Sequence, residues 1–120
     1  MNSTDLKNRT KILALSIIDL VEKLPNNISG KVISNQIVRS GTSVGANYRA
    51  VCRARSDKEF LAKLGIVIEE IDETIFWLEL IESKKWITES EIKQLIIESN
   101  ELTSIFVSSA KTIKRRLNKS

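Results

Sequence analysis

The chain has 120 residues, of which 42% are hydrophobic and 28% charged, with a formal net charge of +4 at pH 7. These values predict one folded domain over residues 1–120 and exclude a disordered chain. No apolar run approaches the roughly 20 residues that span a bilayer and the first residues are polar, so we expect neither a secreted nor a membrane protein. The single cysteine, Cys52, cannot form an intramolecular disulfide, which favours a cytoplasmic location.

The charges are unevenly distributed along the chain. Residues 1–58 hold 10 Lys or Arg against 4 Asp or Glu, and residues 59–105 hold 4 against 11. Residues 106–120 then hold 5 basic residues and no acidic ones. A basic, acidic, basic order suits either a nucleic-acid partner or self-association of unlike faces.

The first predicted helix covers about residues 4–24, with Thr4 or Asp5 as its N-cap. Leucine recurs every seven residues from position 6 to position 20, and Ile12 and Ile18 widen the apolar face of the helix. The only proline of the chain follows and ends this helix, because proline lacks a backbone donor.

The second predicted helix covers about residues 30–54 and begins at Ser29 or Gly30. Its apolar and small residues follow a 4-3-4-3-4 spacing that continues through the glycine-containing stretch 39–50. Each glycine inside a helix costs roughly 1 kcal/mol relative to alanine. We therefore expect a neighbouring helix to pack closely against this stretch and offset the cost.

The third predicted helix covers about residues 57–83, with Ser56 or Asp57 as its N-cap. A heptad pattern with 3-4 spacing predicts its buried face. The residues of that pattern are Leu61, Leu64, Ile68, Ile71, Ile75 and Leu78.

The fourth predicted helix covers about residues 89–117 and follows Thr88-Glu-Ser-Glu91, which is typical of a capping box. It repeats the same 3-4 spacing of buried positions. Four helices joined by short connections predict an all-α fold, an antiparallel up-down-up-down four-helix bundle.

The chain contains no histidine. This excludes Ser-His-Asp and Cys-His nucleophile systems and most zinc sites. The acidic residues of the third helix are better explained as a solvated face or partner surface than as metal ligands. We therefore expect no catalytic residues, no cofactor and no metal, and a protein that is not an enzyme.

Two basic groups are candidates for contacts with nucleic-acid phosphates, which would give salt-sensitive and mostly sequence-independent binding. The group at the end of the second helix comprises Arg49, Arg53, Arg55 and Lys58. The group near the C-terminus comprises Lys111, Lys114, Arg115, Arg116 and Lys119. The alternative is a solubilising face for the first group and compensation of the helix dipole for the second.

Arg39, Ser43 and Asn47 lie four residues apart on the second helix, and the motifs Arg55-Ser56-x-x-Glu59-Phe60 and Trp77-Leu78-Glu79-Leu80 follow. With these motifs the chain resembles the bacterial four-helix-bundle family, also called the 23S rRNA intervening-sequence protein family, over nearly its whole length. The resemblance implies an antiparallel bundle, a homopentamer and no known catalytic activity. It also implies kinship with the accessory protein of diversity-generating retroelements, a basic pentamer that binds nucleic acid and a reverse transcriptase.

The family signature Arg39, Ser43 and Asn47 has two interpretations, a binding site or a polar network that sets helix register. Candidate residues for an interface between subunits lie on the second and third helices. They are Gly41, Gly45, Glu70 and Glu73.

Two functions remain open. The first is a non-enzymatic, pentameric accessory protein that binds RNA or DNA, with a reverse transcriptase or another protein as a further partner. The alternative is a protein–protein scaffold, in which basic and acidic faces of neighbouring subunits join a ring without nucleic acid.

Overall fold

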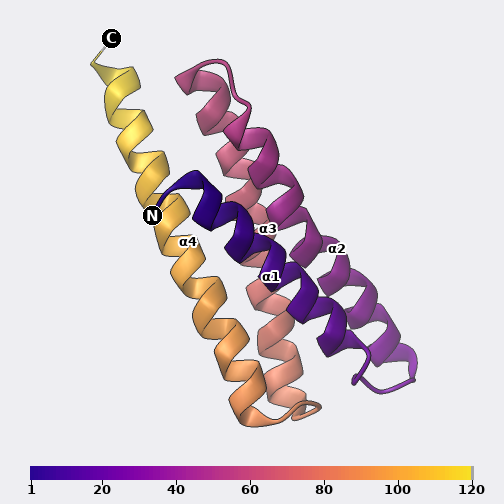
Figure 1. The fold of residues 1–120 in the computed structure, drawn as a ribbon. Helices are drawn as coiled ribbons and strands as arrows, with labels where there is room; N and C mark the ends of the chain where they lie inside the picture. The colour runs from indigo at the N-terminus through magenta and orange to yellow at the C-terminus, as the bar shows by residue number, and fades with distance from the viewer. Residues whose placement is uncertain (120) are drawn as a thin grey trace.

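The computed structural model describes residues 1–119, which form four α-helices and no strand (Figure 1). They are α1 (Ser3–Val21), α2 (Ile28–Cys52), α3 (Asp57–Lys84) and α4 (Glu89–Asn118). Successive helices run in opposite directions along a bundle of 52 × 22 × 21 Å. The prediction of an all-α, antiparallel four-helix bundle is confirmed, and each helix lies within a few residues of its predicted range.

Asparagine side chains define where the first two helices begin. The backbone N–H of Asp5 donates to Asn2 Oδ1 at 2.9 Å, and that of Gly30 donates to Asn27 Oδ1 at 2.8 Å. The N-cap predicted for α1 is therefore wrong by two or three residues, and the predicted start of α2 is late by one or two. Asparagine accepts this bond as well as serine or aspartate does, so the signal was present slightly upstream.

The other two helices begin where the sequence predicts. Ser56 caps α3, because its Oγ accepts the backbone N–H of Glu59 at 3.1 Å. Thr88 is the N-cap residue of α4, but its side chain makes no capping hydrogen bond, so the predicted capping box is wrong.

The core runs along the bundle axis and contains the predicted leucines 6, 13 and 20 of α1 together with apolar residues of the other three helices. On α3 the buried face is rotated from the predicted one, because Val67, Thr74 and Ile81 are fully buried while Ile68 and Ile75 are only half-buried. α3 packs against both α2 and α4. The most buried residues of α3 therefore face the space between α2 and α4.

The glycine-containing stretch of α2 is where α1 crosses it. A Cβ atom at position 41 would lie 2.4 Å from Cδ1 of Ile17, and one at position 45 would lie 3.3 Å from Oγ1 of Thr10. Gly41 is buried. The prediction of close helix packing is confirmed, and the neighbour is α1 of the same chain.

α1 makes few contacts with α4, and polar side chains bridge the two helices. Arg9 Nε donates to Glu98 at 2.9 Å, and Arg9 Nη2 lies 3.0 Å from a carboxylate oxygen of Glu101. Hydrogen bonding to Glu98 raises the pKa of Arg9. Ile12 and Ile18 do not extend the core as predicted, since they are 61% and 38% exposed.

None of the helices in residues 1–119 is long and apolar enough to cross a membrane. Within the same residues, no group of three or more His, Cys, Asp or Glu side chains is placed to hold a metal ion.

Candidate nucleic-acid interface

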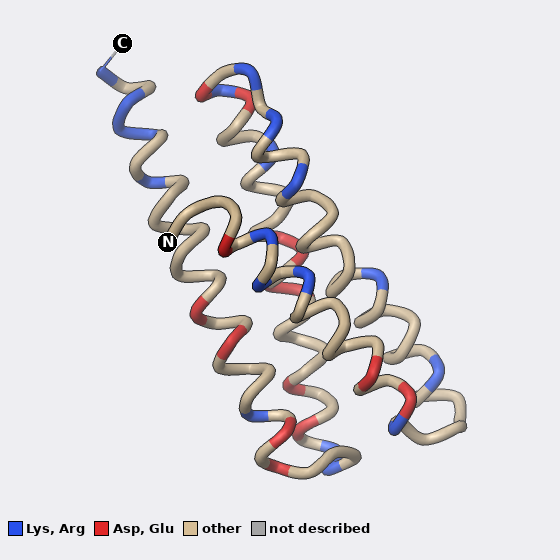
Figure 2. The backbone as a smooth tube through the Cα atoms, viewed as in Figure 1, with Lys and Arg blue, Asp and Glu red and all other residues tan. Residues whose placement is uncertain are grey.

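The basic residues predicted to contact nucleic acid gather at one end of the bundle (Figure 2). The last turns of α2, the start of α3 and the last turns of α4 all lie there. Arg116 of α4 joins these segments, because its Nη2 and Nε donate to the carboxylate of Asp57 at 2.6 and 3.1 Å. Two groups separated by about half the chain therefore form one cationic surface, which we call the basic end.

Few carboxylates neutralise the basic end. The hydrogen bond from Arg116 lowers the pKa of Asp57, so this pair is ionised near neutral pH. The other residues of the two predicted groups make no ion pair with a carboxylate in residues 1–119. They are Arg49, Arg53, Arg55, Lys58, Lys111, Lys114, Arg115 and Lys119.

Two residues absent from the predicted groups, Lys7 and Lys11, also belong to this cationic surface. Both project from α1 into a groove between α1 and α2, which Arg49 and Arg53 line from the other side. Their spacing of four residues on one helix was visible in the sequence. Which neighbouring helix they face depends on how α1 packs. Periodicity alone therefore does not show that Lys7 and Lys11 line the same groove as Arg49 and Arg53.

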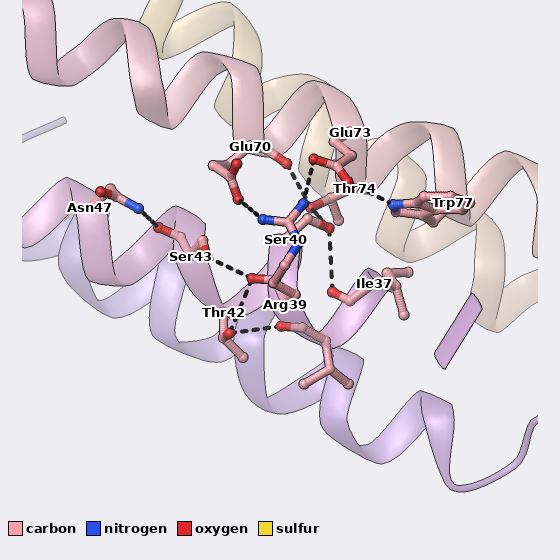
Figure 3. A network of polar contacts seen from close by, with 11 residues as sticks. Ile37, Arg39, Ser40, Thr42, Ser43, Asn47, Glu70, Glu73, Thr74 and Trp77 are labelled. Atoms are coloured by element: carbon pink, nitrogen blue, oxygen red, sulfur yellow. Dashed lines mark hydrogen bonds and ion pairs between the residues drawn. The ribbon is translucent and has the colours of Figure 1, made fainter. Parts of the chain in front are cut away.

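Of the three residues of the family signature, Arg39 connects α2 to α3 (Figure 3). Arg39 Nη1 donates to Glu70 at 3.0 Å, and its Nη2 pairs with Glu73 at 2.5 Å. The side chains of Ser43 and Asn47 instead bond their own helix, donating to the backbone oxygens one turn earlier at 2.6 and 2.8 Å. This arrangement matches a structural polar network.

Electrostatics and a buried hydrogen bond reinforce the same contact. The hydrogen bond that Arg39 donates to Glu73 lowers the pKa of Glu73 and raises the pKa of Arg39. Next to this pair, Thr74 Oγ1 lies 2.9 Å from Ser40 Oγ, and both side chains are fully buried. Arg39 and the Ser40–Thr74 pair thus link α2 to α3.

Contacts within the chain occupy the four residues assigned to an interface between subunits. Gly41 and Gly45 lie against α1, while Glu70 and Glu73 hold Arg39. Gly41 is closed off by Ile17, so it offers no surface to a second subunit. Glu69 and Asp72 of α3 are exposed carboxylates on the same helix.

Cys52 and Tyr48 lie near the basic end but belong to the packing of the bundle. The Tyr48 ring is buried with its centroid 5.4 Å from that of Phe106. Burial and a hydrogen bond with Cys52 raise the pKa of Tyr48, so its hydroxyl stays protonated at neutral pH. Cys52 is half-buried against the core.

The fold and the charge distribution together define a small antiparallel helical bundle with one cationic end. The family model described as 23S rRNA-intervening sequence protein matches residues 3–108, so the chain belongs to that family. The match ends before Lys111, and the C-terminal basic group lies outside it. No curated protein matches the sequence.

A solved structure with the same fold is a protein with unknown function from the S23 ribosomal protein family of Bacteroides thetaiotaomicron VPI-5482. It is 36% identical in sequence, and the alignment covers 88% of this chain and 97% of that chain with a TM-score of 0.80.

Proposed function

We propose that this chain is a non-enzymatic, homo-oligomeric accessory protein, pentameric in solution, that binds RNA or DNA through its basic end. The observation that carries the proposal is the convergence of two distant basic groups, largely without carboxylate partners, on one end of the bundle (Figure 2). Nucleic-acid phosphates supply the missing negative charge and release counterions when they bind. The family resemblance supports the pentamer and a reverse transcriptase as a protein partner, and the single cysteine supports a cytoplasmic location.

A salt titration of binding tests this proposal. Fluorescence anisotropy with labelled RNA and DNA should give a log affinity that falls linearly with log salt, with a slope of about −0.9 per phosphate contacted in a duplex. The triple variant Arg53→Ala, Arg55→Ala, Lys58→Ala should flatten that slope by up to about 3. No binding at low salt would refute the proposal.

A matched control removes three cations from the opposite end of the bundle, with Lys31→Ala, Lys84→Ala and Lys85→Asn. Asparagine is used at position 85 because its backbone φ is 57°, a conformation that asparagine tolerates. These lysines make no ion pair within residues 1–119. Binding like that of the wild type is expected, and an equal loss in both triple variants would show that only net charge matters.

The scaffold function is the second candidate, and exposed apolar residues of α1 and α4 favour it. Ile12, Leu15 and Ile97 are 61%, 52% and 64% exposed. Ile12 lines a groove of about 440 Å³ between α1 and α4. Covering such residues is a reason for subunits to associate.

Light scattering after size exclusion tests the assembly in both functions. A particle of five 13.6 kDa chains is expected, and a monomer at all concentrations would contradict it. Under the scaffold function, Glu69→Lys with Asp72→Lys should break the particle, because reversed charges on an acidic face repel the basic face of the next subunit. These positions are preferable to Glu70 and Glu73, whose reversal would also disrupt the contact with Arg39.

A further inference from the structure

The basic residues of α1 lie on two different faces of the helix. Arg9 points to α4, where Glu98 and Glu101 neutralise it. Lys7 and Lys11, one turn apart, line the groove between α1 and α2 and have no carboxylate partner within residues 1–119. The same short segment therefore has one satisfied cation and two unsatisfied ones.

The groove between α1 and α2 has four cationic side chains on its rims and small residues on its floor. Its volume is about 350 Å³, and no acidic residue lines it. The lining residues are Lys7, Thr10, Lys11, Ala14, Thr42, Gly45, Ala46, Arg49 and Arg53. Glycine and alanine keep the floor low, so the long basic side chains stand above it on both sides.

The hydroxyl groups of the floor are already used. Thr10 Oγ1 donates to the backbone oxygen of Leu6 at 2.8 Å, and Thr42 Oγ1 donates to that of Val38 at 2.7 Å. The remaining side-chain donors are the four exposed cations. A small anion would find no buried, directional donor there, whereas an extended polyanion could contact both rims.

Folding brings these like charges together at a cost. Lys7 and Lys11 stand at i and i+4 on one helix, as do Arg49 and Arg53 on the other, and like charges at this spacing are destabilising. The packing of α1 on α2 then places the two pairs across one groove. A bound polyanion relieves this repulsion.

The positions of the aromatic residues indicate whether the groove suits double-stranded or single-stranded nucleic acid. Proteins that bind single strands combine a basic groove with aromatic rings on which bases stack. Tyr48 is buried near the basic end, and the strongly exposed ring, Phe76, lies on α3 among acidic residues. Within residues 1–119 the groove has phosphate-binding side chains and no stacking platform.

We propose that the groove between α1 and α2 binds the phosphate backbone of double-stranded nucleic acid, with Lys7 and Lys11 on one rim and Arg49 and Arg53 on the other. This inference rests on the proposed nucleic-acid-binding function and names its ligand class and contact residues. A duplex shows two rows of phosphates and keeps its bases stacked inside, which matches a site that offers charge alone.

The experiment compares Lys7→Gln/Lys11→Gln with the control Lys31→Gln/Lys84→Gln, which removes two cations from the opposite end. Each protein is titrated with a 20-bp RNA duplex, a 20-bp DNA duplex and unstructured single strands of the same length. The Lys7/Lys11 variant should bind either duplex about 10- to 100-fold more weakly at 0.1 M salt, with a slope flatter by about 2. The control should bind like the wild type, and the wild type should prefer duplex to single strand.

The outcomes separate the two proposals. No binding by the wild type would refute the nucleic-acid function and with it this site. Wild-type binding that is unchanged in the Lys7/Lys11 variant would refute the groove alone. A preference for single strands would overturn the ligand class. Circular dichroism of the variants checks that both remain folded, and weakened binding together with intact helicity supports the groove.

Discussion

Gly41→Ala probes the contact that positions α1 on α2. The new methyl group would lie 2.4 Å from Cδ1 and 3.3 Å from Cγ2 of Ile17, a fully buried residue. Overpacking a core in this way costs about 1–3 kcal/mol, while alanine in place of glycine gains about 1 kcal/mol of helix propensity. We expect the free energy of unfolding to fall by about 1 kcal/mol, the difference between these effects.

Ile17→Val removes the Cδ1 atom that the new methyl group would meet. Alone, this substitution should cost about 1 kcal/mol, because it deletes one buried methyl group. In the double variant the methyl at position 41 occupies part of the space that Cδ1 left. The double variant should therefore lose about 1–2 kcal/mol less than the two single losses combined.

Urea unfolding of the wild type, both single variants and the double variant measures this coupling. All four are compared at one protein concentration, since assembly makes stability concentration-dependent. Gly65→Ala is the control, because a Cβ atom at position 65 meets nothing within 4 Å. This substitution should stabilise the protein by about 1 kcal/mol through the higher helix propensity of alanine. Losses at positions 17 and 41 that add within about 0.5 kcal/mol would refute the contact.

Two further predictions concern polar groups. Arg39 holds the pKa of Glu73 below its ordinary value of 4.5. The ion pair therefore stabilises the fold above pH 4.5, and this stabilisation is lost as the pH falls through the lowered pKa of Glu73. Arg39→Ala should remove this contribution and so weaken the dependence of stability on pH in the acidic range. Unfolding curves between pH 3 and pH 6 should be less pH-dependent in the variant, and equal slopes would contradict the ion pair. Ser99→Ala should raise the free energy of unfolding by about 1 kcal/mol, because within residues 1–119 the fully buried Ser99 hydroxyl has no hydrogen-bond partner. Destabilisation of that variant in urea would show that the hydroxyl is satisfied.

The local features of this protein could be predicted from its sequence. Helix ranges follow from the spacing of apolar residues and from caps such as Ser56, which act within a few residues of the chain. Helical structure through residues 39–50 was predicted from the same spacing despite two glycines. Both basic groups of the candidate interface were also visible, since clusters of lysine and arginine are a property of sequence.

The partners of each helix face could not be predicted in this way. Periodicity indicates that a face is apolar but not how many helices cover it, so the rotated core of α3 and the exposure of Ile12 were missed. Arg39 forms its ion pairs with Glu70 and Glu73, and these partners likewise could not be predicted because they depend on how α2 packs on α3.

Tertiary packing also decided the composition of the basic end. The sequence determined four amphipathic helices, their order and the charges on each. The structure decided that Lys7 and Lys11 meet Arg49 and Arg53 across one groove, and that Arg9 turns to α4 instead. The physical reason is the close crossing of α1 over Gly41 and Gly45, because glycine lets Ile17 and Thr10 approach α2 and so fixes the rotation of α1.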